Sequence, residues 1–277
     1  MNKKFTHVIT VSLLLLAQAV CAHGDVSEKI RQLNAKVAVE PDNLQWRFQR
    51  GVQWLLNQHA DDALDDFNVV AARDPMYPQI YFYLARSHAM EGNRDDALAA
   101  FEMAVMLSAD NAEAQKDVLI QRASFLQQQK RYAAAADDWR RVLQLAQHPQ
   151  SDWWLLAARN LYVAGARDKA MQLLDEAMLK MGPVLLFEEQ QIDWLLAQQK
   201  NDAALQRLDQ LVARSERPEL WLIRKGDVLL ANNDKTQALE HFQQALDRFA
   251  QLPDHVKQRP ATRQQLQQLQ NKIASMQ

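Results

Sequence analysis

The sequence Asp-Asp-Ala-Leu-Asp-Asp-Phe at residues 61–67 returns as Asp-Asp-Ala-Leu-Ala-Ala-Phe at residues 95–101, which is 34 residues later. An alanine followed four residues later by a large apolar residue occurs in this register six times. The six pairs are Ala63/Phe67, Ala97/Phe101, Ala135/Trp139, Ala170/Leu174, Ala204/Leu208 and Ala238/Phe242. The successive large residues lie 34, 38, 35, 34 and 34 positions apart. This period predicts an array of stacked helical units with a four-residue insertion between the second and the third.

Two further positions follow the same register. Twelve residues before each alanine we expect a small residue, because two helices must approach closely there. The residues found are Gly51, Ala85, Ala123, Ala158, Ile192 and Gly226, of which only Ile192 departs. Two residues before each alanine we expect the second helix of the unit to begin. The residues found are Asp61, Asp95, Ala133, Asp168, Asp202 and Thr236, and five of these six types can cap a helix.

These copies resemble the tetratricopeptide repeat family, whose units pair two antiparallel helices over 34 residues, and the resemblance covers residues 44–252. It implies an all-α fold, a right-handed α-solenoid of about six helix-turn-helix repeats, with the first helix of each repeat on the concave face. The departures at Ile192 and around 110–113 imply that the fifth and third units bend or extend locally. Surfaces of this kind usually bind proteins or peptides.

Residues 1–22 have the pattern of a secretory signal peptide. Lys3 and Lys4 precede an apolar run over 8–19, and small residues end at Ala22. We therefore expect cleavage after Ala22, a periplasmic or secreted protein, and no transmembrane segment in the mature chain. Two alternatives stay open: an uncleaved membrane anchor, and lipid attachment at Cys21.

Amphipathic segments flank the repeat array on both sides. In residues 23–43 we predict an N-terminal capping helix, and in residues 253–277 a C-terminal capping helix. The apolar face of the first consists of Val26, Ile30, Leu33 and Val37. The apolar face of the second consists of Leu266, Leu269, Ile273 and Met276. Both segments should cover the apolar sides of the terminal repeats.

Composition excludes several classes of function. The formal net charge is −2, so the chain lacks the basic footprint that nucleic acid requires. Its single cysteine lies in the predicted signal peptide, which leaves no disulfide or thiolate metal site in the mature chain. No paired-histidine metal motif, glycine-rich phosphate loop or serine elbow is present. We therefore expect no enzyme, no cofactor and no metal.

Four aspartates crowd the start of one predicted helix: Asp61, Asp62, Asp65 and Asp66. They could attract a cation, but they lack the alternating ligands and the glycine of a calcium loop. We interpret them as a solvated acidic first turn, which the helix dipole favours.

In the family register, the first helices direct nine polar or aromatic side chains toward the concave groove. These candidate ligand-binding residues are Tyr83, Arg86, Gln121, Arg159, Tyr162, Glu189, Asp193, Arg224 and Asp227. Arginine pairs with carboxylates, and tyrosine offers apolar area together with a hydroxyl group. The alternative is that these charges pair with one another between adjacent repeats. The family's clamp for chaperone carboxyl termini is not expected, because Phe48 and Val52 stand where it needs lysine and asparagine.

The leading hypothesis is an exported scaffold or adaptor without enzymatic activity. It would bind a protein or peptide in the groove and support envelope assembly. A second hypothesis makes the chain an accessory or regulatory subunit of an envelope enzyme complex in cell-wall or exopolysaccharide processing. A third is a hydrolase or metal protein hidden in the repeats. A homodimer is a further hypothesis, because repeat arrays expose extended surfaces.

Overall fold

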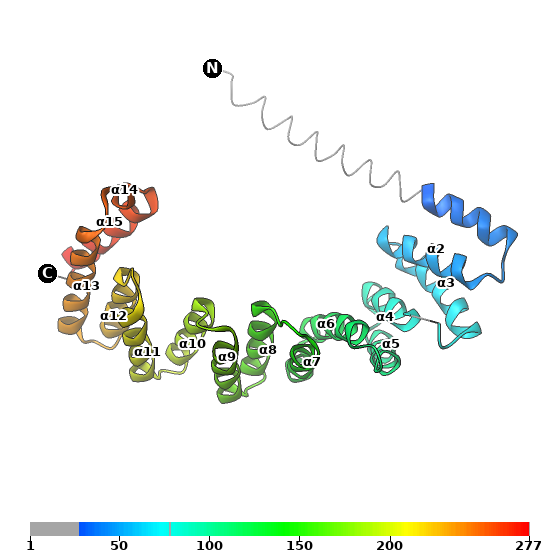
Figure 1. The fold of residues 1–277 in the computed structure, drawn as a ribbon, viewed down its shortest axis with the longest axis horizontal. Helices are drawn as coiled ribbons and strands as arrows, with labels where there is room; N and C mark the ends of the chain where they lie inside the picture. The colour runs from blue at the N-terminus through cyan, green and yellow to red at the C-terminus, as the bar shows by residue number, and fades with distance from the viewer. Residues whose placement is uncertain (1–27, 78, 277) are drawn as a thin grey trace, which may run out of the picture. The chain divides into compact units, whose positions relative to one another are not determined.

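A computed structural model describes residues 28–77 and 79–276. All regular structure in these residues is α-helical (Figure 1). The predicted signal peptide, and the predicted capping helix up to residue 27, lie outside the described residues. A helix over 28–39 comes first and is followed by six helix pairs. The pairs are α2 (Leu44–Leu56) with α3 (Ala60–Arg73), α4 (Ile80–Met90) with α5 (Arg94–Leu107), α6 (Ala112–Gln128) with α7 (Tyr132–Leu145), α8 (Ser151–Val163) with α9 (Arg167–Met181), α10 (Leu185–Ala197) with α11 (Asn201–Arg214), and α12 (Glu219–Ala231) with α13 (Lys235–Gln251). The short α14 (Asp254–Lys257) and the longer α15 (Pro260–Ala274) complete the series.

The predicted repeat register is present throughout the described structure. All six alanines of the pattern are 0% exposed, and the large residues that follow them are at most 3% exposed. Each first helix ends 11 residues before the large residue of its repeat, for example at Leu56 before Phe67 and at Gln128 before Trp139. The all-α fold of stacked helix pairs is therefore confirmed.

The small-residue position is where the two helices of a repeat approach each other. A methyl group added to Gly51 would lie 2.6 Å from the Phe67 ring, and one added to Gly226 would lie 2.4 Å from the Phe242 ring. Ile192 departs from the pattern and is fully buried, in one cluster with the equally buried Leu208. There the larger side chain on the first helix is matched by a smaller one on the second, which conserves core volume.

The turn between the two helices has one conformation in all six repeats. Nine residues before each large residue, the backbone adopts a positive φ between 58° and 89°. The residues there are Gln58, Gly92, Lys130, Gly165, Gln199 and Asn233. Glycine adopts this left-handed conformation without steric cost, whereas the glutamines and the lysine do not.

The predicted helix starts were wrong by one or two residues. The second helices begin three residues before the repeat alanine, as α3 does at Ala60, so Asp61 lies in the first turn and is not the cap. The residue at the cap of α3 is His59, which makes no capping hydrogen bond with its side chain. Of the second helices with a described cap, α13 is the one that is capped by a side chain, through Asp234. The aspartates of the first turn therefore stabilise their helices through the helix dipole and not as caps.

The four-residue insertion is an additional turn at the start of α6. This helix has 17 residues, whereas α2, α8, α10 and α12 have 13 each. Because α6 ends in the common register, the extra residues extend it in the N-terminal direction, where the sequence departs from the family pattern.

Buried ion pairs join the two helices of the first and third repeats. Arg50 donates to both carboxylate oxygens of Asp66, at 2.8 and 2.7 Å, and Arg122 does the same to Asp138, at 2.8 and 2.6 Å. These hydrogen bonds raise the pKa of both guanidinium groups, and burial partly opposes the rise. In the second repeat the same two positions hold the buried apolar residues Leu84 and Ala100.

The chain divides into two compact units between Ala170 and Met171, inside α9. In the first unit, the helix over 28–39 buries Ile30, Leu33 and Val37, and its Asn34 accepts a hydrogen bond from Arg50 of α2. In the second unit, α15 packs against α13, and Leu269 of α15 joins the core around Phe242.

No helix within the described residues has the length and apolarity that crossing a membrane requires.

Candidate functional site

First helices of neighbouring repeats lie side by side in three places. Phe48 of α2 and Tyr83 of α4 meet edge to face, with ring centroids 5.2 Å apart. Asn160 of α8 donates to the side chain of Gln127 of α6 at 3.1 Å. Arg224 of α12 forms an ion pair with Asp193 of α10. Each contact lies within one compact unit, and together they place the first helices on common surfaces.

In the first unit, Tyr83 and Arg86 form an aromatic and cationic cluster on α4. The Tyr83 ring is half-buried and also contacts Phe67, at a centroid distance of 5.6 Å. The Arg86 guanidinium lies over the rings of Phe82 and Tyr83, at 5.6 and 5.9 Å. Within residues 28–77 and 79–276, no acidic side chain forms an ion pair with Arg86. The aromatic rings position this cation while leaving its charge uncompensated.

The other candidates of the first unit lie on α6 and α8. Gln121 and Arg159 are exposed and Tyr162 is half-buried. The Arg167 guanidinium lies 5.7 Å from the centre of the Tyr162 ring. These residues occupy two neighbouring first helices, and their role in binding stays a prediction.

In the second unit, three of the four candidate charges are paired within the protein. Arg224 and Asp193 bind each other, and Asp227 forms an ion pair with Lys272 of α15. Glu189 is half-buried on α10. The Arg224–Asp193 pair follows the alternative raised from the sequence, in which the groove charges pair with one another between adjacent repeats. The Asp227–Lys272 pair instead joins a groove candidate to the C-terminal helix α15.

A cavity of about 470 Å³ lies where α4, α5 and α6 meet. Its walls come from residues 76–77 and 79–83, from the end of α5 and from the start of α6. The lining residues are Met76, Tyr77, Gln79, Ile80, Tyr81, Phe82, Tyr83, Ala104, Leu107, Ser108, Asn111, Ala114, Asp117 and Val118. Burial, and secondarily the Asp74 carboxylate, raise the pKa of Tyr77. We call this space the α4–α6 cavity.

A second, smaller cavity of about 350 Å³ lies between the helix over 28–39 and α2. Phe48, Val52 and Tyr83 form apolar parts of its lining, and Lys29 and Lys36 are its charged residues. The Lys36 ammonium group also lies 3.9 Å from the centre of the Trp46 ring. We call this space the N-terminal cavity, and Tyr83 lines it as well as the α4–α6 cavity.

Sequence reasoning missed most of the residues that line the α4–α6 cavity, including Met76, Tyr77, Tyr81 and Asp117. Most of these residues lie at the ends of helices or between them, where the repeat register says nothing about direction. The signal that could have found the cavity was the interval of 38 residues, because an enlarged junction leaves space between repeats.

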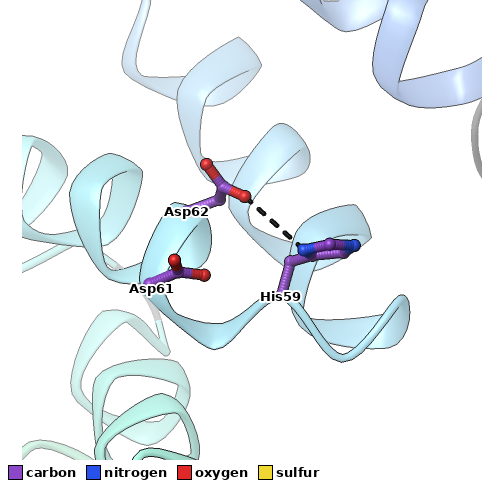
Figure 2. Close-up of side chains that lie close together, drawn as sticks. All are labelled: His59, Asp61 and Asp62. Carbon is purple, nitrogen blue, oxygen red and sulfur yellow. Dashed lines mark ion pairs between the residues drawn. The ribbon is translucent and has the colours of Figure 1, made fainter.

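At the start of α3, the structure brings His59 together with Asp61 and Asp62 (Figure 2). The His59 Nδ1 atom lies 3.7 Å from a carboxylate oxygen of Asp62, and the rings of His59 and Trp54 meet edge to face at 5.5 Å. His59 and Asp61 are exposed. Asp66, the fourth aspartate of the predicted acidic turn, points instead into the core toward Arg50. The acidic turn is thus split between solvent and a buried ion pair.

Comparison with known proteins identifies relatives of the same repeat class. A family model described as tetratricopeptide repeat matches residues 57–114 and 191–253. The chain is 30% identical over 93 residues to the tetratricopeptide repeat and J domain-containing co-chaperone DNJ1 of Fusarium oxysporum f. sp. lycopersici. That match covers 34% of this chain and only 18% of the co-chaperone.

Two solved structures show the same fold at low identity. The match to the structure of Naa15/Naa10 bound to HypK-THB covers 85% of this chain and 36% of the matched chain, with 15% identity and a TM-score of 0.61. The match to the C-terminal part of a TPR repeat-containing protein from Cytophaga hutchinsonii covers 87% of this chain and 97% of the matched chain, with 12% identity and a TM-score of 0.56. Six helix pairs share one register, and the tetratricopeptide repeat model matches the first and last parts of the array, so the chain carries tetratricopeptide repeats in these two parts.

Proposed function

We propose that this protein is an exported, non-enzymatic adaptor that holds a protein or peptide segment on the surface of its first helices and supports envelope assembly. The tetratricopeptide fold is a scaffold for protein–protein interactions, because stacked repeats expose a continuous surface. The observation that carries the proposal is Arg86, whose charge is positioned by Phe82 and Tyr83 and lacks an acidic partner among the described residues. Arginine and aromatic side chains are the types that dominate binding energy at interfaces.

Export is proposed from the sequence of residues 1–22. A cationic start, an apolar run and small residues before the predicted cleavage site support it. Expression of the full chain in a Gram-negative host, followed by fractionation and N-terminal analysis, should give a periplasmic protein that begins at His23. A cytoplasmic chain that retains residues 1–22 would contradict the export proposal.

Ultracentrifugation of the purified chain tests the separate prediction of a homodimer.

A photo-crosslinking amino acid tests the binding surface. We expect the probe at Gln121, on the first helix of the third repeat, to capture a discrete partner in cells. The matched control is Asp137, on the second helix of the same repeat, whose side chain is 75% exposed. Equal capture at the two positions, or capture at Asp137 alone, would place binding away from the first helices and reject the proposal.

A further inference from the structure

The α4–α6 cavity is associated with the extra turn of α6. The repeat register places the four added residues at the start of this helix, and Ala114, Asp117 and Val118 from its first two turns line the cavity. The volume of about 470 Å³ falls within the range of about 300–1,000 Å³ that is typical of ligand pockets. A deviation in repeat length therefore coincides with a hollow large enough for a bulky side chain.

The lining of this cavity is largely aromatic and apolar, and it also contains the polar residues Gln79, Ser108 and Asn111 and one charged residue. Tyr77, Tyr81 and Phe82 supply aromatic walls, and apolar side chains such as Met76 continue them. Met76 itself is 70% exposed. Asp117 is the one charged residue among the described lining residues, and it is exposed. Such a site favours a large apolar group that carries a positive charge beside it.

We propose that the α4–α6 cavity binds a large apolar side chain of a partner peptide, and that a lysine or arginine next to that side chain faces Asp117. The inference rests on the proposed function, since it names the chemistry of the segment that the first helices hold. Tyr83 connects the two, because it lines the cavity and belongs to the predicted groove. The apolar side chain gives most of the affinity, and the cation gives selectivity.

The N-terminal cavity makes the charge selectivity testable. It also has an aromatic wall at Phe48 and Tyr83, but its charged residues are Lys29 and Lys36. A cation beside the apolar side chain is therefore favoured in the α4–α6 cavity and disfavoured in the N-terminal cavity. The charge preference of a bound peptide reports which of the two it occupies.

The probes are three fluorescein-labelled synthetic peptides with a neutral Gly/Ser frame around one phenylalanine. They differ only in the residue after the phenylalanine, which is lysine, glutamine or glutamate. Fluorescence anisotropy at low salt should rank their affinities as lysine, glutamine and then glutamate, with the lysine peptide about fivefold tighter than the glutamine peptide. Equal affinities, no measurable binding of any peptide, or a preference for glutamate would overturn the inference.

Three variants locate the bound peptide. Asp117→Lys should invert the ranking, and Ala114→Phe should fill the cavity and weaken the lysine peptide at least about tenfold. Lys36→Glu, in the N-terminal cavity, is the matched control and should leave the ranking unchanged. A ranking that shifts further toward the lysine peptide in Lys36→Glu and stays unchanged in Asp117→Lys would place the peptide in the N-terminal cavity and refute the proposal. Because Asp117 is exposed, Asp117→Lys should leave the fold intact. It therefore still decides the test if Ala114→Phe lowers helicity.

This experiment separates the inference from the proposed function. If capture at Gln121 persists in cells while the three peptides bind equally, the scaffold function holds and the cavity assignment fails. If capture at Gln121 is absent as well, the proposed function fails together with the inference that rests on it.

Discussion

The first helices of the two units carry similar residue types, but their charges have different neighbours. In the second unit, Arg224 binds Asp193 and Asp227 binds Lys272, so these charges link helices to one another. In the first unit, Arg86 lies on aromatic rings, and two cavities open beside the same α4 surface. A charge at a groove position is therefore weak evidence for ligand binding until its partners are known.

Ion pairs outside the predicted groove differ in the same way. Asp138 of the first unit has a side chain only 7% exposed, whereas Asp175, which accepts hydrogen bonds from Gln191 and Arg207 in the second unit, is 47% exposed. Charges that are withdrawn from water depend strongly on their partners, and exposed ones do not. The comparison predicts that removal of the arginine from each pair has unequal effects.

The largest expected difference is between Arg122→Ala and Arg207→Ala. Removing Arg122 leaves the Asp138 carboxylate buried without its partner, which should lower the free energy of unfolding by about 2–4 kcal/mol. Removing Arg207 should cost less, about 1–2 kcal/mol, because Asp175 stays hydrated and the main loss is the hydrogen bond that Arg207 donates to the buried Gln191 side chain. Urea unfolding measures both changes, and hydrogen exchange localises them.

A double variant controls this prediction. Arg122→Leu with Asp138→Ala copies the buried Leu84 and Ala100 of the second repeat and should recover most of the lost stability. If the double variant is as unstable as Arg122→Ala, the unpaired carboxylate is not the cause.

Substitution of the contact glycines should affect both units alike. Gly51→Ala and Gly226→Ala each place a methyl group against a phenylalanine ring, and each should lower stability by about 1–2 kcal/mol, since the steric cost exceeds the gain in helix propensity. Phe242→Leu in the Gly226→Ala background copies the Ala158/Leu174 combination and should restore part of the loss. A more stable Gly226→Ala protein would contradict the close approach.

Charge reversal on the first helices should separate binding from packing. We expect Arg86→Glu to reduce the yield of crosslinking at Gln121 about fivefold to tenfold with unchanged helicity, because the positioned cation is lost. Arg224→Glu should leave that yield unchanged and lower stability by at most about 1 kcal/mol. The reverse outcome would transfer the binding role to the second unit.

The smallest effects are expected at the turns, which the two units share. Lys130→Gly and Gln199→Gly should each raise stability by about 0.5–1 kcal/mol, because glycine removes the strain of φ near 58–59° and costs only part of that in entropy. Gly165→Ala, at φ 89°, is the matched opposite change and should lower the midpoint of thermal unfolding. Unequal gains at positions 130 and 199 would show that the two turns are not equivalent.

The fold could be predicted because its determinants are local and repeated. The interhelical contact requires a small residue, the buried alanine has no space for another side chain, and the large residue fills what remains, so residue type reports position directly. Helix starts were less predictable, because aspartate is favoured both at the cap and in the first turn. Asp61 and Asp234 look alike in the sequence, but only Asp234 is a cap.

The candidate site could be predicted only in part. The register placed Tyr83 and Arg86 on a first helix, but it could not show that Arg224 meets Asp193 or that Asp227 meets Lys272, 45 residues away. Such pairs depend on side-chain direction across helices. The α4–α6 cavity depends on three helices at once, and the sequence recorded it only as an irregular interval.

The additional turn of α6 also shows how such an array tolerates change in length. Four residues advance an α-helix by about 6 Å and rotate it by about 400°, which returns the following side chains to within about 40° of their former direction. An insertion of two residues would instead turn the buried stripe toward solvent. An insertion close to one full helical turn can therefore widen a junction between repeats while the helix keeps its apolar face toward the core. The residues that line such a junction can then change without changes in the core.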